Sequence, residues 1–290
     1  MSNLSVVIVN YKSWAPLTRC LDSLLNQKKI KLNIIVIDNN SDDNNFIDFK
    51  SKYKSIYWIK NLKNYGFSKA CNIGAKIAKS EWILFLNPDT IIPENCLNKL
   101  MIKASFEENK IIGIKQLNEK GNNTHAYGLF LNIHSINGVF RLIYRIFNNQ
   151  TRKKLSKNEF FSPDWISGSF FLIRKKDFDR IGGWNEDFFM YYEDMDICKR
   201  AKYLNIETKF YNNLYCYHFH GKSSRFDNVI KVNSKAEVIK SSHIFIRNHY
   251  KGFYSKLISL ILFLFQITEL IILSLFIKEK RKIIYKLLKR

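Results

Sequence analysis

Apolar runs that end abruptly at polar residues recur through the first third of the chain. The runs lie at residues 4–10, 32–38, 56–59 and 82–86, and most are rich in Val, Ile and Leu. Continuous apolar runs of this length are typical of parallel strands that are covered on both faces. Helical patterns separate them, at about residues 16–27, 44–54 and from 64 onward. This alternation predicts an α/β fold with a mainly parallel central sheet flanked by helices.

Carboxylate and amide side chains stand where these runs stop. Asp38 ends the second run, and Asn87, Pro88 and Asp89 follow the fourth. Ligands of open α/β sheets bind at the carboxyl ends of the strands, and the fixed φ of Pro88 stiffens the turn that carries Asp89. Asp89 is therefore a candidate ligand for a hard metal ion. An Asp in a type I turn after Pro is also a common structural arrangement.

Two later helices are predicted to begin with polar side chains that suit ligand binding. Ser68, as the N-cap of one helix, would leave backbone N–H groups facing the crevice, where they fit a phosphate. The other helix, at about 194–204, has Asp194 in its first turn, where the helix dipole favours an ionised carboxylate. Asp196 and Arg200, four residues apart, are expected to form a supporting ion pair.

The C-terminal region has a different pattern. Residues 257–277 are almost entirely apolar and about long enough to span a bilayer, but Gln266 and Glu269 lie near the middle, where a carboxylate in hydrocarbon is costly. A cluster of Lys and Arg follows. An interfacial helix on anionic lipid is the preferred interpretation, a single span is the second, and a dimer-forming helix is the third.

Composition narrows the class of partner. The chain has 290 residues with 47 Lys and Arg against 25 Asp and Glu, a formal net charge of +22, which favours an anionic partner. No recognisable nucleic-acid module accompanies the charge, so a membrane surface or a phosphorylated substrate is preferred to nucleic acid. The five cysteines form no CxxC pair, and the N-terminus carries no signal-peptide pattern, which indicates a reducing cytosol.

Several short blocks together resemble a known enzyme family. In chain order they are Val9-Asn10-Tyr11, Ile37 to Asp43, Asn64 to Gly74, Leu86-Asn87-Pro88-Asp89-Thr90, Ser167-Gly168-Ser169 and Phe188 to Arg200. Each block alone is weak, but the ordered set covers roughly residues 4–225. The chain is similar to inverting family 2 glycosyltransferases of GT-A fold, in their rhamnosyltransferase-like branch.

The resemblance implies a role for each candidate site residue. Asp194 would be the catalytic base, and Asp89 with His218 would hold a divalent metal, Mg²⁺ or Mn²⁺. Asn87 occupies the first acidic position of the metal motif, and His220 is the alternative to His218. Residues implied on the nucleotide side are Asn10, Tyr11, Asp38, Asn64, Asn72 and Asn87. Residues implied on the acceptor side or as support are Ser167, Gly168, Trp184, Glu193, Asp196, Arg200 and His220.

The predicted protein has one enzyme domain followed by a helical segment. A GT-A domain over residues 1–250 would comprise a nucleotide-binding half (about 1–115) and an acceptor half (about 116–250), followed by a membrane-associating helical segment at 251–290. The enzyme would move a sugar, with rhamnose favoured, from a dTDP- or UDP-sugar to a lipid-linked or surface-glycan hydroxyl. It would work at the cytoplasmic face of the cell membrane, as a monomer or a homo-oligomer. The alternative is a non-catalytic nucleotide- or glycan-binding protein that keeps the fold.

Overall fold

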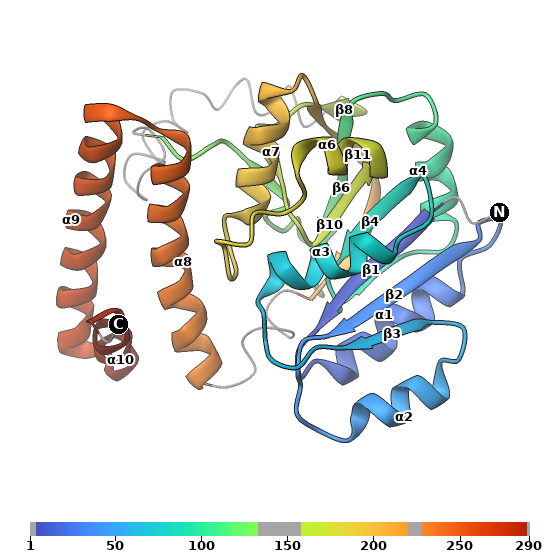
Figure 1. Cartoon of the computed structure of the whole chain (residues 1–290), viewed down its shortest axis with the longest axis horizontal. Coiled ribbons are helices and arrows are strands. Elements are labelled where there is room, and N and C mark those ends of the chain that lie inside the picture. The colour runs from blue at the N-terminus through green and yellow to red at the C-terminus, as the bar shows by residue number, and fades with distance from the viewer. Residues whose placement is uncertain (1–3, 133–157, 220–227, 289–290) are drawn as a thin grey trace.

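The computed structural model describes residues 4–132, 158–219 and 228–288 (Figure 1); His220 lies outside the described residues. The first half contains β1 (Leu4–Asn10), α1 (Trp14–Leu25), β2 (Leu32–Asp38), α2 (Asn45–Lys52), β3 (Tyr57–Lys60), α3 (Phe67–Ile77), β4 (Trp82–Leu86), β5 (Thr90–Ile91), α4 (Cys96–Ala104) and β6 (Lys110–Leu117). The second half contains β7 (Tyr127–Gly128), β8 (Phe160–Phe161), β9 (Trp165–Ile166), β10 (Phe170–Arg174), α6 (Lys175–Ile181), α7 (Glu193–Tyr203), β11 (Glu207–His218), α8 (Asn228–His249), α9 (Gly252–Phe276) and α10 (Lys278–Leu288).

The central sheet is mixed, with a parallel half formed by the N-terminal strands. Its order is β3-β2-β1-β4-β10-β6-β11-β5, and β8 also pairs with β11. β1 runs parallel to β2 and β4, β2 parallel to β3, and β6 parallel to β11. β10 is antiparallel to both of its neighbours, β4 and β6. The predicted α/β fold is confirmed, and β10 joins the two parallel groups.

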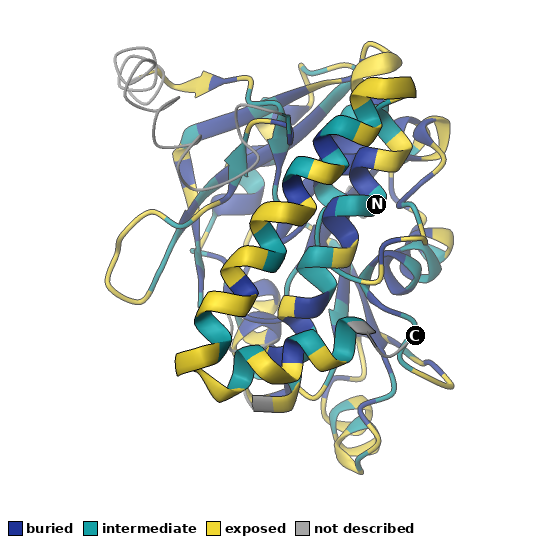
Figure 2. Cartoon of the chain, turned by 90° about the vertical axis from the view of Figure 1, so that its left-hand side faces the viewer, coloured by how far each residue is buried: buried dark blue, intermediate teal, exposed yellow. Residues whose placement is uncertain are grey.

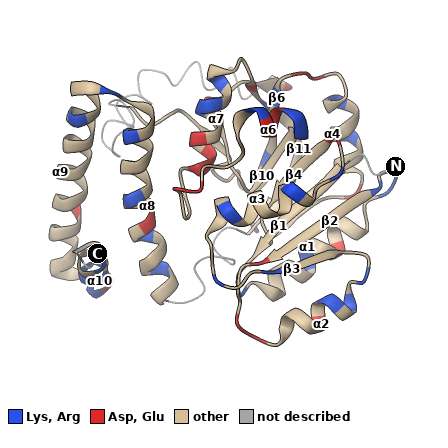
Figure 3. Cartoon of the chain, viewed as in Figure 1, with Lys and Arg blue, Asp and Glu red and all other residues tan. Residues whose placement is uncertain are grey.

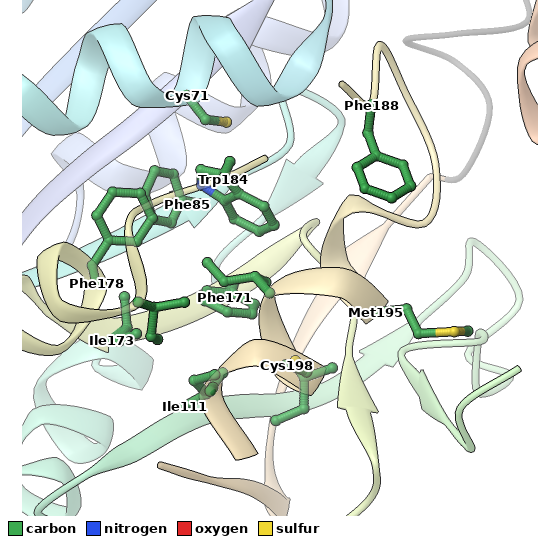
Figure 4. Packing of buried hydrophobic residues seen from close by; sticks show 14 of the residues in the cluster. Cys71, Phe85, Ile111, Phe171, Ile173, Phe178, Trp184, Phe188, Met195 and Cys198 are labelled. Carbon is green, nitrogen blue, oxygen red and sulfur yellow. The ribbon is translucent and has the colours of Figure 1, made fainter. Parts of the chain in front are cut away.

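Apolar residues cover both faces of the sheet, which explains the continuous hydrophobic runs. Val6 belongs to the cluster under α1 and α4, whereas its neighbour Val7 belongs to the cluster under α3, α6 and α7. Successive residues of a strand point to opposite faces. Phe85 is fully buried and lies between Phe178 and Trp184, with ring centroids 5.0 and 5.1 Å away (Figure 4). Large aromatic groups of this kind dominate the energetics of a core.

One predicted helix start is wrong by two residues. The N-cap of α3 is Gly66, and Ser68 lies buried in the first turn of the helix. Gly66 has φ = +82°, and a Cβ there would lie 2.5 Å from the Phe189 carbonyl oxygen. Only glycine permits this approach, which brings the start of α3 against the loop before α7. The Phe67 N–H donates to the same carbonyl at 2.7 Å.

The C-terminal helices form an antiparallel arrangement beside the sheet domain. Helices α8 and α9 lie side by side, and α10 folds back beneath them (Figure 1). Val232 and Ala236 of α8 share a buried cluster with Leu270 of α9 and Ile283 of α10. Helix α9 has a mean hydropathy of 2.3 over its most apolar window and is long and apolar enough to cross a membrane. The predicted apolar helix is confirmed.

Candidate active site

A cavity of about 540 Å³ lies at one edge of the sheet. It is lined by segments that follow β1, β2 and β4, by the turn before β10, by the loop into α7, by the end of β11 and by one face of α8. The sequence-predicted residues that line it are Tyr11, Asn64, Asn87, Asp89, Ser167, Gly168, Glu193, Asp194 and His218. Those that do not are Asn10, Asp38, Asn72, Trp184, Asp196 and Arg200.

Asp89 and His218 form one corner of the cavity. β5 pairs antiparallel with the end of β11, so that Thr90 lies opposite His218. His218 Nε2 is 3.3 Å from Asp89 Oδ1, and the Phe219 N–H donates to the Asp89 carbonyl at 3.0 Å. The described residues contain no group of three or more His, Cys, Asp or Glu side chains that would hold an ion alone. A carboxylate oxygen and an imidazole nitrogen nevertheless suit a divalent ion that keeps water or phosphate oxygens as its other ligands.

Gln116 orients the imidazole of His218. The Gln116 side chain is buried, and its Oε1 accepts a hydrogen bond from Ser169 Oγ at 2.9 Å. The same oxygen lies 2.8 Å from His218 Nδ1. Because a carbonyl oxygen only accepts, this amide orientation places a proton on Nδ1, and Nε2 is the ring nitrogen that faces Asp89. Sequence reasoning missed Gln116, whose one signal is that it is an amide in an apolar strand.

Asp194 and Glu193 form a second corner. Asp194 Oδ2 accepts from the Gly168 N–H at 3.3 Å, and Oδ1 accepts from the Met195 N–H at 2.8 Å. Burial raises the pKa of Asp194 to about 6. Burial and the charge of Asp194 also hold the pKa of Glu193 well above its ordinary value. A carboxylate with a pKa near the working pH is suited to accept a proton during a reaction.

The loop before α7 has an unusual backbone. Tyr191 and Tyr192 have φ angles of 70° and 65°, in the left-handed region that side-chain-bearing residues rarely adopt. Both residues line the cavity. The Ser241 hydroxyl of α8 donates to the Met190 carbonyl at 2.9 Å and helps to hold this loop. Strained backbone of this kind persists only where surrounding contacts fix it, and it is concentrated at functional sites.

Asn10 and Asp38 lie behind the cavity wall. Both are fully buried, and Asn10 Nδ2 donates to Asp38 Oδ1 at 3.1 Å. Asp38 Oδ2 accepts from the Ser41 N–H at 3.1 Å. The next residue, Asn39, does line the cavity, and its amide bonds to the side chains of Asn61 and Asn64. Asn39 lies in the block from Ile37 to Asp43 but is not among the predicted site residues; its position directly after Asp38 is the signal that could have identified it.

Asn72 and Trp184 connect α3 to the loop that follows α6. Asn72 Nδ2 donates to the Trp184 carbonyl at 2.8 Å, and the Trp184 N–H donates to Asn72 Oδ1 at 3.0 Å. The Trp184 indole is buried in the core, with 1% of its surface exposed (Figure 4). Both side chains therefore stabilise the frame around the cavity.

The expected ion pair within α7 is present and has a third member. Arg200 Nε donates to Asp196 Oδ2 at 2.8 Å, and His249 Nε2 lies 2.7 Å from Asp196 Oδ1. Arg200 also donates to the Ile181 and Gly183 carbonyls. His249 ends α8, so this buried cluster joins the helix that carries Asp194 to the C-terminal helices.

The cavity is acidic although the chain is strongly basic. None of the described residues that line the cavity is Lys or Arg. Four of them are acidic, namely Asp89, Glu193, Asp194 and Glu237. Figure 3 shows the acidic start of α7 in red and the positions of Lys and Arg in blue along many other elements. An anionic ligand that enters this space therefore needs a cation from outside these lining residues.

Helix α8 forms the wall that the sequence did not predict. Its residues Asn233, Ser234 and Glu237 line the cavity together with Ile230 and Val238. On another side His125 stacks on Trp165, with ring centroids 5.9 Å apart and ring planes 12° from parallel. Aromatic side chains with a few polar groups among them are the usual lining of a small-molecule site.

The chain is similar to known proteins by family profile, by sequence and by fold. The profile of glycosyl transferase family 2 matches residues 5–182, and a profile described as the N-terminal domain of galactosyltransferase matches residues 147–222. The rhamnosyltransferase WbbL of Escherichia coli (strain K12) is 27% identical over 187 residues, which cover 59% of this chain and 68% of that protein.

A second relative is similar over a longer region. An N-acetylglucosaminyl-diphospho-decaprenol L-rhamnosyltransferase of Mycobacterium tuberculosis (strain ATCC 25618 / H37Rv) is 23% identical over 270 residues, 87% of this chain and 86% of that protein. Among solved structures, GalNAc-T7 with UDP, GalNAc and Mn²⁺ superposes with a TM-score of 0.57 at 17% identity. The superposition covers 75% of this chain and 44% of that one, and at this identity it shows a common fold.

Proposed function

Because the chain belongs to glycosyl transferase family 2, we propose that it transfers rhamnose from a nucleotide-sugar to a hydroxyl group of a lipid-linked or surface glycan. It is a glycosyltransferase of the rhamnosyltransferase-like type. The M. tuberculosis relative is named for an L-rhamnosyl transfer to a diphospho-lipid amino sugar. That similarity supports the choice of rhamnose and of a lipid-linked acceptor.

The reaction would be a single displacement with inversion. The acceptor hydroxyl attacks the anomeric carbon on the face opposite the nucleoside diphosphate, which leaves with the electron pair of the broken C–O bond. Asp194 takes the proton of the hydroxyl as the new bond forms. Glu193, Ser167 and Gly168 surround this carboxylate on the acceptor side. Trp184, Asp196 and Arg200 act behind them as support.

The donor would lie between β1, β2 and the Asp89 corner. Tyr11 and Asn64 border the nucleoside, with Asn10 and Asp38 behind them. Asn87 flanks the diphosphate, and Asn72 supports the loop beside the sugar. Asp89 and His218 would hold a Mg²⁺ or Mn²⁺ ion, which when bound supplies the positive charge that stabilises the leaving diphosphate. The absence of Lys and Arg from the described cavity lining supports this assignment.

One observation carries the proposal. The pair Asp89 and His218 and the pair Glu193 and Asp194 come from distant parts of the chain and face the same cavity. The first pair suits a metal-bound diphosphate, and the second provides a carboxylate with a pKa raised to about 6. Donor activation and proton removal are the two tasks that an inverting transfer requires.

The location we propose is the cytoplasmic face of the cell membrane. The apolar α9 and the basic α10 support a peripheral attachment. A lipid-linked acceptor would then be within reach of a cavity whose wall is α8.

A ligand panel tests the donor site. The full chain is heated with dTDP, UDP, GDP and their sugars, with and without Mn²⁺ or Mg²⁺, and its melting temperature is recorded. A ligand that binds only the native state stabilises it, by about 2.7 kcal/mol at one hundred times its Kd. We expect metal-dependent stabilisation by dTDP or UDP. Folded protein that responds to no nucleotide would contradict the donor site.

The catalytic assignment is tested with Asp194→Asn. General-base catalysis contributes about 10²–10⁴-fold to a rate, so the rate of transfer should fall by that factor. The nucleotide Kd, obtained from the thermal stabilisation, should stay within about twofold of the wild-type value. Asp187→Asn, an exposed residue of the preceding loop, is the matched control and should keep normal turnover. Normal turnover by Asp194→Asn would refute the role of this carboxylate.

A further inference from the structure

The outward side of α9 is an exposed and mainly apolar surface, and its one charged residue, Lys256, lies near the start of the helix. Leu260, Leu264, Ile271 and Leu275 recur at spacings of four and seven, so they share one helix face. Each is more than half exposed, and Phe276 is 80% exposed (Figure 2). Monomeric soluble proteins rarely expose apolar patches of this extent unless the patch binds something.

The amide and the carboxylate of α9 point elsewhere, whereas Thr268, four residues after Leu264, is exposed on the outward side. Gln266 faces α8, where its Oε1 lies 3.0 Å from His243 Nε2 and its Nε2 donates to Ser242 Oγ at 3.1 Å. Glu269 pairs with Lys280 of α10 at 3.3 Å. The two residues that made a membrane helix costly in the sequence are thus satisfied by neighbouring helices, and the outward face keeps its apolar character.

Helix α8 argues against a span. α8 packs along α9 from the His243–Ser259 contact to the Ala236–Leu270 contact. α8 also carries Lys231, Lys235 and Lys240 and contacts the catalytic domain on its other side. A spanning α9 would have to draw these charges into hydrocarbon or separate from α8.

Charge identifies the kind of surface that α9 meets. Lys278, Arg281 and Lys282 at the start of α10 are exposed directly after α9 ends, and Tyr285 beside them is 65% exposed. Basic residues that flank an apolar helix face, with an aromatic residue between polar and apolar zones, favour anionic lipid headgroups. A second copy of the chain would present the same positive charges and so offers them no complementary charge.

We propose that α9 and α10 bind an anionic membrane from one side, with the face of Leu260, Leu264, Ile271 and Leu275 inserted and the lysines of α10 at the headgroups. The helices lie along the surface and do not cross it. This deepens the proposed location and does not depend on the identity of the sugar or the acceptor.

Vesicle sedimentation tests the surface. Purified full chain is mixed with preformed vesicles of phosphatidylcholine, with or without 30% phosphatidylglycerol. Leu264→Glu with Ile271→Glu should lose at least tenfold in affinity for both, because carboxylates would have to enter the apolar layer. Leu62→Glu, at a 90% exposed apolar residue of the catalytic domain, is the matched control and should bind like the wild type. Lys278→Glu with Lys282→Glu should lose mainly the preference for anionic vesicles, by roughly tenfold or more.

Protease protection separates lying from spanning. The chain is expressed with a C-terminal tag, and inverted membrane vesicles are prepared from the cells. If α9 and α10 lie on the surface, protease should remove the tag, and alkaline carbonate should release the protein from the membrane. A protected tag and resistance to carbonate would overturn the proposal in favour of a span. The proposal would also be overturned if Leu264→Glu with Ile271→Glu sedimented with vesicles as well as the wild type. It would be overturned as well if the wild type were a dimer and this variant a monomer, because the face would then bind a second copy. Stabilisation by UDP or dTDP, measured on the same samples, keeps failure of this surface distinct from failure of the donor site.

Discussion

At the scale of single residues, His218 and Asp194 each depend on a neighbour, and only one of these neighbours, Gly168, belongs to a predicted block. Gln116 directs the imidazole of His218, and the backbone N–H of Gly168 fixes Asp194. The sequence identified Asp89, Asp194 and His218 because they stand at the ends of apolar runs or in known blocks. It did not identify Gln116, since 102 residues separate it from His218 and only the pairing of β6 with β11 brings them together.

Replacing Gln116 should weaken metal binding while leaving the fold intact. Partners that orient a ligating histidine are typically worth 10–100-fold in metal affinity. Gln116→Leu keeps similar bulk but has no acceptor for His218 Nδ1, so Mn²⁺ affinity in the presence of nucleotide should fall by that factor, as measured by paramagnetic resonance titration. Gln116→Glu retains the acceptor and should remain within a few-fold of the wild type. Equal affinity of all three proteins would show that Gln116 has no role at the metal.

The raised pKa of Asp194 predicts two opposite effects of pH. With a pKa of about 6, transfer should fall roughly tenfold per unit as the pH drops below 6, because the base becomes protonated. Stability changes the other way. The native pKa lies above the ordinary value of 3.8, so the unfolded state loses its proton first and the native state loses stability as pH rises between about 4 and 6.

The control for this pH effect is Asp194→Asn, which cannot titrate. Its melting temperature should gain on that of the wild type between pH 4 and 6, and above pH 6 the difference should remain constant. Parallel curves for the two proteins over the whole range would mean that Asp194 is not the group with the raised pKa.

At the scale of elements, the N-terminal strand–helix units and the later helices α7 and α9 could be predicted, whereas the place of β10 and the role of α8 could not. A parallel strand buried on both faces is marked by its own apolar run, as in β1, β2 and β4. The place of β10 between β4 and β6 is a non-local choice that no local pattern encodes. Helix α8 likewise has no strong apolar stripe, because one side faces the cavity and another faces α9.

Glycine substitutions test the contact between α3 and the loop before α7. A Cβ at Gly66 would meet the Phe189 carbonyl, whereas Gly121, with a similar φ of +75°, has open space around it. Gly66 combines its positive φ with a ψ of 177°, a backbone conformation that is essentially restricted to glycine, so Ala there has a backbone cost of about 1–3 kcal/mol. The positive φ of Gly121 makes Ala there cost about 1–2 kcal/mol. Only Gly66→Ala adds a steric cost of about 1–3 kcal/mol. Gly66→Ala should therefore unfold at a lower urea concentration than Gly121→Ala. Equal midpoints would show that the loop before α7 can shift without cost to make room for the Cβ.

At the scale of the whole molecule, charge is divided between surface and cavity. The chain carries a net charge of +22, yet the described residues that line the cavity supply carboxylates and no Lys or Arg. The net charge is read directly from the sequence and predicts an anionic partner. That the cavity is acidic could not be predicted, because its lining residues come from distant segments of the chain. A basic exterior attracts anionic lipid, and an acidic interior requires a cation to accompany a diphosphate.

Salt should separate the two contributions to membrane binding. The Debye length falls from about 10 Å at 0.1 M salt to about 3 Å at 1 M. Affinity for phosphatidylglycerol vesicles should therefore drop towards the affinity for neutral vesicles as NaCl rises, while binding to neutral vesicles persists because it rests on α9. Sedimentation across a NaCl series measures both. Loss of binding to neutral vesicles in parallel would mean that charge alone holds the protein.

The position of α8, between the cavity and α9, changes how the enzyme meets its acceptor. Packed helix axes are typically 8–10 Å apart, so a protein held by α9 keeps its catalytic space within one helix layer of the lipid. Under the proposed attachment, the search for the proposed lipid-linked acceptor is confined to a plane, and confinement raises the effective concentration of that acceptor without any added contact. An enzyme in this situation needs little intrinsic affinity for its acceptor, and weak recognition allows the lengthened glycan to leave quickly.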